Sequence, residues 1–354
     1  MAAKPPKKRL RVSKVDIDPG PFRSLPMTLI LVILSLLALI VLANSAAASP
    51  HSSLSSFFTA LLAFFNLSVL GLVILLWLVT RLPLPTDLPL SPGFFSAVAQ
   101  SFIAPLGAAA LWGLVVLLPS FRRLLARFTP LKADSPVHTL ALVLAAYLVA
   151  NTLITLNQGG LEALAETTEA ASAGSLVLTG GALLAAAFLG VGLGTRRSWA
   201  EGQERLGLRP LRLADFRHAL PWIIFLLLSQ GVAGLLVSII DPEQLKLLEN
   251  VNLALLSDLD SVIEWFLLGL TSSVGEELLF RGAIQPAFGL LPTAALFAVA
   301  HLQYGLSPLM LFIFVMGIVL GYLRHRHSTN VTILVHFGYN FALGLLALLS
   351  DSLS

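Results

Sequence analysis

The sequence predicts an all-α, polytopic bundle of about eight to ten transmembrane helices. Hydrophobic residues make up 56% of the 354 residues and charged residues only 12%, which is about half the charged share of a soluble domain. Runs of about 20 apolar residues, long enough to cross a hydrocarbon core of about 30 Å, recur along the chain. These runs must be helices, because lipid cannot satisfy a strand edge and the alternation of a barrel strand is absent.

Each of these apolar segments is a candidate crossing. They are 27–48, 57–79, 95–118, 137–156, 173–194 and 221–240, followed by 262–280, 291–304, 309–323 and 331–349. Segments 291–304 and 309–323 are short for a full span. We therefore divide the chain into a basic tail at 1–26, an N-terminal transmembrane extension at 27–194 and a C-terminal core at 195–350.

Lysine and arginine predict the orientation, because cytoplasmic loops carry an excess of them. The tail 1–26 is basic and is expected to be cytoplasmic, and the basic loop 196–217 lies opposite the acidic segments 157–172 and 241–260. Three full spans after a cytoplasmic tail would place the basic loop 119–132 outside. Either one of the first three segments does not cross, with 95–118 the best candidate for a re-entrant segment, or the rule is broken once.

The start of the chain has a second interpretation. Residues 29–41, followed by Ala43-Asn44-Ser45-Ala46, resemble the apolar region and cleavage site of a signal peptide. The long basic leader favours a retained membrane anchor instead.

Composition also excludes several functions. The chain has no cysteine, which rules out disulfides, thiol nucleophiles and cysteine-ligated metals. The basic residues lie in the tail and the short loops, so they indicate orientation rather than nucleic-acid binding. The expected partner is the lipid bilayer.

Ionisable side chains gather in the last hundred residues, within or at the ends of apolar helices. A charge at mid-membrane costs roughly 2.5–3.5 kcal/mol on insertion scales, so each such residue is a functional hypothesis. Glu264 lies near a membrane boundary and is expected to be interfacial. The others are Glu276, Glu277, Arg281, His301 and His336.

Helical spacing predicts that these groups meet. Glu277 and Arg281 are four residues apart and can pair on one face of a helix. Glu276 then points about 100° away. The same spacing recurs between Phe297 and His301 in the next element, and between His336 and Asn340 in the last.

Two histidines, a glutamate and an asparagine at one point suit hydrolysis. A glutamate can take a proton from water, and a histidine can orient that water or bind a metal that activates it. An asparagine and a second histidine can donate to a developing oxyanion. No His-Glu-x-x-His stretch occurs, so any metal would need ligands from separate helices.

Three motifs carry a family resemblance. They are Glu276-Glu277-Leu-Leu-Phe-Arg281-Gly282, Phe297-Ala-Val-Ala-His301 and His336-Phe-Gly-Tyr-Asn340. Their order and separations resemble those of the CPBP family of intramembrane proteases, which includes the type II CAAX prenyl endopeptidases, or Ras-converting enzymes, and the bacterial Abi proteins. The resemblance covers about 196–349 and implies a C-terminal catalytic bundle.

The resemblance implies a role for each motif position. Glu276 would be the catalytic base, His301 would help to activate the water, and His336 with Asn340 would form the oxyanion site. Three further motif residues would support them, since Glu277 and Arg281 would hold the first helix in register and Phe297 is expected to pack. Whether Glu276, His301 and His336 hold a divalent metal such as zinc stays open.

The function implied by the resemblance is that of an intramembrane endopeptidase, and a metalloendopeptidase if the metal is present. Its substrate would be a membrane-embedded or lipid-anchored peptide or protein, with a CAAX-type substrate left open. We expect a multi-pass protein of the plasma membrane. The alternative is a non-catalytic scaffold or bacteriocin-immunity-type protein of the same fold. A transporter is disfavoured because the polar groups crowd into one end of the chain.

Overall fold

A computed structural model of the protein describes residues 27–50, 52–82 and 92–353, which form helices joined by short connections. Eight of the described helices are long and apolar enough to cross a membrane, and these ranges contain no strand. The prediction of an all-α polytopic bundle is confirmed. The eight helices are α1 (Met27–Ala48), α2 (Ser53–Val79), α3 (Pro92–Val115), α5 (Pro136–Asn157), α7 (Ala173–Val191), α9 (Leu213–Ile240), α14 (Pro308–Arg326) and α15 (Thr329–Leu353).

Shorter helices complete the bundle. Four of them lie between spans, namely α4 (Pro119–Leu125), α6 (Gly160–Thr167), α8 (Trp199–Leu206) and α10 (Pro242–Leu256). The C-terminal part adds α11 (Val262–Glu276), the π-helix η1 (Glu277–Ile284), α12 (Gln285–Phe288), α13 (Leu290–Val299) and the 3₁₀ turn η2 (Leu302–Tyr304). The predicted helix 291–304 therefore ends early, whereas 309–323 extends to a full span of 19 residues.

Helix α9 begins eight residues before the predicted start at Pro221, and a local ion pair explains why. Asp215 lies in its first turn, where its carboxylate accepts a hydrogen bond from the Arg212 backbone N–H at 2.8 Å. The Arg209 guanidinium also lies 2.6 Å from the same carboxylate. Negative charge at a helix N-terminus is stabilising, so the helix starts at Leu213 and Pro221 lies inside it.

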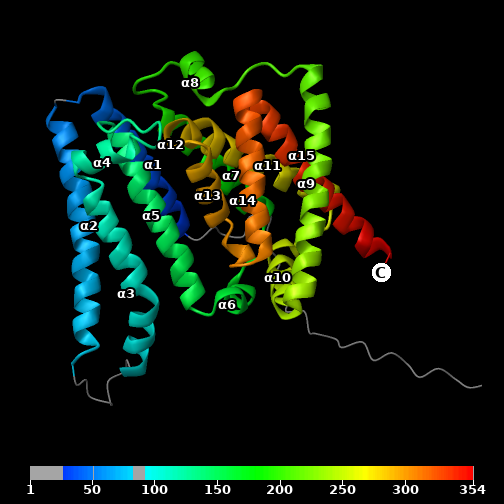
Figure 1. The fold of residues 1–354 in the computed structure, drawn as a ribbon, viewed down its shortest axis with the longest axis horizontal. Helices are drawn as coiled ribbons and strands as arrows, with labels where there is room; N and C mark the ends of the chain where they lie inside the picture. Colours follow the sequence, from blue (N-terminus) through cyan, green and yellow to red (C-terminus); the bar gives the residue numbers. More distant parts are fainter. Residues whose placement is uncertain (1–26, 51, 83–91, 354) are drawn as a thin grey trace, which may run out of the picture.

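The two ends of the bundle differ in charge. Helices α4, α8 and α12 lie at one end and α6 and α10 at the other (Figure 1). The basic loops after α3, α7 and α14 therefore share one end, and the acidic segments share the opposite end. This distribution agrees with the predicted alternation of the loops across a membrane.

Helix α1 runs parallel to α7, and this direction bears on the predicted cytoplasmic tail. Near the C-terminal end of α1, Asn44 donates to the carbonyl of Leu189 at 2.8 Å, close to the C-terminal end of α7. Helix α1 thus starts at the acidic end, away from the basic loops. Helix α3 is a candidate span with Pro105 inside it, so we find no re-entrant segment at 95–118. The predicted cytoplasmic tail lies outside the described residues, so its orientation stays a prediction.

The sequence Ala43-Asn44-Ser45-Ala46 is built into the bundle. Asn44 is fully buried, and its side-chain oxygen accepts from Arg196 Nη2 at 2.6 Å. A buried polar group with these partners is costly to remove. This packing supports a retained α1 rather than a cleaved signal peptide.

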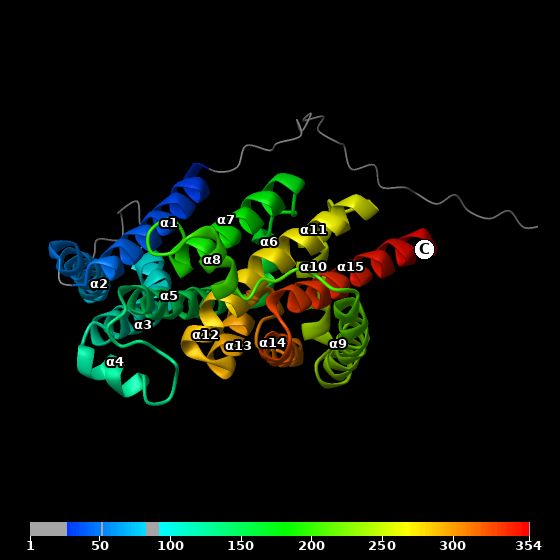
Figure 2. The same cartoon turned by 90° about the horizontal axis from the view of Figure 1, so that it is seen from above.

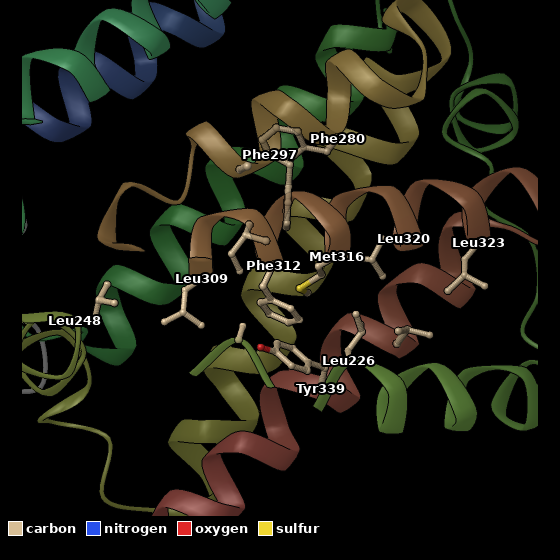
Figure 3. Packing of buried hydrophobic residues seen from close by; sticks show 14 of the residues in the cluster. Leu226, Leu248, Phe280, Phe297, Leu309, Phe312, Met316, Leu320, Leu323 and Tyr339 are labelled. Atoms are coloured by element: carbon tan, nitrogen blue, oxygen red, sulfur yellow. The ribbon is translucent and has the colours of Figure 1, made fainter. Parts of the chain in front are cut away.

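The largest apolar cluster lies in the C-terminal half. Seen from above, α1–α4 occupy one flank of the molecule and α9, α14 and α15 the other (Figure 2). Phe312, Met316 and Leu320 of α14 pack toward Tyr339 of α15 and Leu226 of α9 (Figure 3). The same cluster includes Phe280 and Phe297, so it fixes the elements that carry the polar motifs.

Helices α7 and α11 approach closely through two glycines. A Cβ atom placed on Gly180 would lie 2.8 Å from the Cβ and carbonyl oxygen of Thr271, and one on Gly275 would lie 3.0 Å from the Gly180 oxygen. Small residues allow such backbone contact between membrane helices. Because Gly275 precedes Glu276, this contact sets the position of the first motif.

We expect Gly180→Ala to destabilise the protein by about 1–3 kcal/mol, because the added methyl group overpacks the contact. The neighbouring Gly181 is the matched control, since a Cβ there meets nothing within 4 Å. Gly181→Ala should leave stability unchanged or raise it, because alanine favours a helix interior. Thermal unfolding of the detergent-solubilised protein measures both, and equal midpoints for the two variants would contradict the close contact.

Candidate active site

The two glutamates of the first motif lie where α11 passes into η1. Glu276 ends α11 and Glu277 begins the π-helix. The Glu277 side chain is fully buried, whereas that of Glu276 is 18% exposed. We predicted a regular helix here, and the π-helical turn corrects that expectation. Such turns are rare and occur often at functional sites.

Glu277 is the centre of a buried charged cluster. Its Oε1 atom lies 3.1 Å from Arg281 Nη1, so the predicted pair is present. The same oxygen accepts a hydrogen bond from His336 Nδ1 at 2.9 Å. Glu277 thereby joins η1 to α15, and both of its partners are almost completely buried.

Arg281 has a second contact that the sequence did not suggest. Its guanidinium carbon lies 4.0 Å from the centroid of the Phe297 ring, a distance at which a cation is attracted to the ring face. Its nitrogens form no hydrogen bond within the described part of the chain. The carboxylate of Glu277 and the face of Phe297 therefore compensate its charge. Phe297 is fully buried, as expected for a packing residue.

His301 lies just after α13 rather than within a helix. Its Nδ1 atom is 2.7 Å from the carbonyl oxygen of Phe297. A carbonyl can only accept a hydrogen bond, so Nδ1 carries a proton and a neutral ring has a free lone pair on Nε2. The ring of Phe297 lies 4.5 Å from that of His301 and restricts its orientation.

The free nitrogen of His301 faces Glu276. The distance from His301 Nε2 to Glu276 Oε2 is 3.7 Å, which is too long for a direct hydrogen bond. One water molecule about 2.8 Å from each atom can bond to both. Glu276 Oε2 is buried and has no hydrogen-bond partner among the described residues. These two atoms can therefore hold and deprotonate one water.

His336 and Asn340 lie one turn apart on α15. His336 Nδ1 is occupied by Glu277, so only its Nε2 atom can contact a substrate. The Asn340 amide donates to Ser272 Oγ at 3.1 Å and keeps a second N–H. His336 thus joins α15 to η1, and Asn340 joins α15 to α11, the helix that ends at Glu276. Their predicted part in an oxyanion site stays a prediction.

The three predicted metal ligands are not brought together. Across the described ranges, no group of three histidine or acidic side chains could hold an ion. Glu276 and His301 face each other, whereas His336 bonds to Glu277 through Nδ1 and has only Nε2 free. A catalytic zinc normally has three protein ligands, so the described donor set does not fit the predicted metal.

Two residues near the site were missed by the sequence reasoning. Ser272 lies one helical turn before Glu276 and binds Asn340. The Tyr304 ring lies nearly parallel to that of His301, with centroids 6.4 Å apart. Ser272 could have been found from its spacing of four residues from Glu276. Tyr304 gave no signal, because it follows a break in the helix.

We expect Glu277→Gln to destabilise the protein by about 3–5 kcal/mol, because it leaves the Arg281 charge uncompensated in an apolar setting. The double variant Glu277→Gln/Arg281→Met should recover much of that loss, since it removes both charges. Thermal unfolding of the single and double variants in detergent measures this coupling. Purely additive losses would mean that the two residues do not interact.

The family comparison agrees with the motifs. Residues 258–342 match the family of type II CAAX prenyl endopeptidase Rce1-like proteins. The matched segment contains all seven predicted site residues and lies inside the predicted core 195–350, whose limits stay a prediction. No curated protein and no solved structure matches the chain. The predicted resemblance is confirmed for this segment, since residues 258–342 match the Rce1-like family of type II CAAX prenyl endopeptidases.

Proposed function

We propose that this protein is an intramembrane endopeptidase that hydrolyses a peptide bond of a membrane-associated substrate. The observation that carries the proposal is the 3.7 Å approach of Glu276 Oε2 and His301 Nε2 inside a bundle of membrane helices. A general base and a hydrogen-bond acceptor aimed at one point suit the activation of water. The family match at 258–342 supports the same reaction class.

In the proposed reaction, the Glu276 carboxylate takes one proton from water, while the other hydrogen stays on the oxygen and donates a hydrogen bond to His301 Nε2. The oxygen attacks the scissile carbonyl carbon and gives a tetrahedral oxyanion. Glu276 then returns its proton to the leaving amine as the carbon–nitrogen bond breaks. The products are a carboxylic acid and an amine, so the atoms of one water are consumed.

The proposed roles of His336 and Asn340 follow from the parts of their side chains that have no partner among the described residues. The second N–H of Asn340 is available for the oxyanion. His336 can donate only from Nε2, because its Nδ1–H already donates to Glu277. A ring that is protonated at Nδ1 has an Nε2–H only when it carries both protons. Glu277 would then serve the reaction through His336 rather than by touching the substrate. Donors of this kind contribute roughly 2.7–4 kcal/mol each.

The proposed substrate is a peptide or protein held in the membrane by its own apolar segment or by an attached lipid. A CAAX-type substrate is the first to test, given the matched family. We expect the enzyme in the plasma membrane, with the basic end of the bundle facing the cytoplasm.

We expect Glu276→Gln to lower the rate of peptide cleavage by at least about 100-fold, because the general base is lost. The test uses purified, detergent-solubilised protein and a prenylated peptide with a C-terminal CAAX sequence. Glu249→Gln, which removes an exposed acid on α10, is the control and should retain full activity. A normal melting temperature shows that the Glu276 variant is folded, and full activity of that variant would rule out the mechanism.

We expect activity to survive prolonged dialysis against a chelator, because only two of the three predicted metal ligands converge. The measurement compares initial rates before dialysis, after dialysis and after addition of Zn²⁺. Loss of activity that Zn²⁺ restores would show that a metal takes part and that a further ligand joins Glu276 and His301.

A further inference from the structure

A large cavity separates the N-terminal extension from the catalytic region. Its volume is about 1430 Å³, larger than the roughly 300–1,000 Å³ of most small-molecule sites. Helices α1, α5 and α7 form one side, and η1, α12 and α13 form the other. Glu276, His301 and His336 do not line it, so this cavity is distinct from the candidate active site.

One end of the cavity is basic. Two acids also line it, but Glu201 is engaged by Ser198, whose hydroxyl donates to its carboxylate at 2.8 Å. Burial, and then the positive charges of neighbouring arginines, hold the pKa of Arg205 below its usual value. The basic residues at this end are Lys132, Arg196, Arg197, Arg205 and Arg324.

The arginines at this end differ in whether their side chains have hydrogen-bond partners within the protein. Arg196 donates to Asn44, and Arg205 donates to the Gly282 carbonyl at 2.9 Å. Arg324 has a buried Nε without a hydrogen-bond partner among the described residues. A clustered positive charge with an unused donor favours an anionic ligand.

The rest of the cavity is apolar and follows a membrane helix. On α1 the lining runs from Leu29 to Ile40, a rise of about 17 Å along the helix axis. This length is close to half of a hydrocarbon core of about 30 Å, the thickness of one leaflet. The basic end lies with the basic loops, the end that the positive-inside rule assigns to the cytoplasm.

We propose that this cavity binds one anionic phospholipid of the cytoplasmic leaflet, with its headgroup at Arg324 and the neighbouring bases and its acyl chains along α1, α5 and α7. The combination of a basic end with an apolar wall one leaflet long fits this amphipathic anion. A small soluble anion would use only the basic end, and a neutral lipid would leave the charges unpaired.

The bound lipid would contact the back of the catalytic element. Leu279 and Phe280 of η1 line the cavity, and Phe280 packs edge-on against Phe297 at 5.3 Å. Phe297 in turn contacts Arg281 and His301. The lipid therefore stabilises the wall that supports the site, whichever reaction the site performs.

The test measures thermal unfolding of the full chain in a neutral detergent with added phosphatidylglycerol, phosphatidylcholine or inorganic phosphate. We expect phosphatidylglycerol alone to raise the melting temperature by a few degrees, as a ligand of the folded state does. An equal rise with phosphatidylcholine would overturn the role of charge. An equal rise with inorganic phosphate would overturn the lipid in favour of a small anion.

Two variants test the location, each with a matched control. Arg324→Gln should lose most of the rise caused by phosphatidylglycerol, whereas Arg123→Gln, a base at the same end outside the cavity, should keep it. Leu36→Trp should narrow the apolar part and reduce the rise, whereas Leu34→Trp, exposed on the same helix but not in the lining, should keep it. An undiminished rise in both Arg324→Gln and Leu36→Trp would overturn the site.

Discussion

The buried charge of Arg281 is the constraint on which the C-terminal half depends. A cation inside a membrane bundle is costly unless it is paired, and here the partners come from three elements. Glu277 lies 3.1 Å away on the same π-helix, Phe297 of α13 presents its ring face, and His336 of α15 shares the Glu277 carboxylate. Compensating one charge therefore fixes η1, α13 and α15 relative to one another. The two groups that face the proposed water lie next to these elements, since Glu276 directly precedes η1 and His301 follows α13.

Much of this arrangement could be predicted from the sequence. The Glu277–Arg281 pair followed from a spacing of four residues, and the spans followed from apolar length. The contact of His336 with Glu277 could not be predicted, because spacing within a helix does not give the depth or rotation of a neighbouring helix. The π-helical turn was missed for a related reason, since hydrophobic periodicity shows a helix but not one extra residue in a turn. No three histidine or acidic side chains gather to hold a metal among the described residues, and whether Glu276, His301 and His336 bind one stays a prediction.

In the N-terminal half, the charges of the loops alone do not determine the direction in which each helix runs. Because the tail and the loop 119–132 are both basic, the sequence left two alternatives open, a segment at 95–118 that does not cross or one exception to the positive-inside rule. The structure instead has a full-length α3 and an α1 parallel to α7. Helix α1 therefore begins at the acidic end of the bundle, and the orientation of the protein in a membrane stays a prediction. Tertiary contacts such as Asn44 with Leu189 give the direction of a helix, whereas the positive-inside rule gives only a preference.

The two adjacent glutamates differ in burial and in their partners, so one can have a structural role and the other a chemical one. Glu277 is fully buried and contacts the Arg281 cation and the His336 imidazole, so its negative charge is already paired. Glu276 is one residue earlier, partly exposed, and its Oε2 atom approaches His301 without bonding to it. A carboxylate that must take and return a proton cannot also be locked in an ion pair, because the pair would stabilise its charged form alone. A paired acid beside an unpaired one thus supplies a stable frame and, in the proposed reaction, the base.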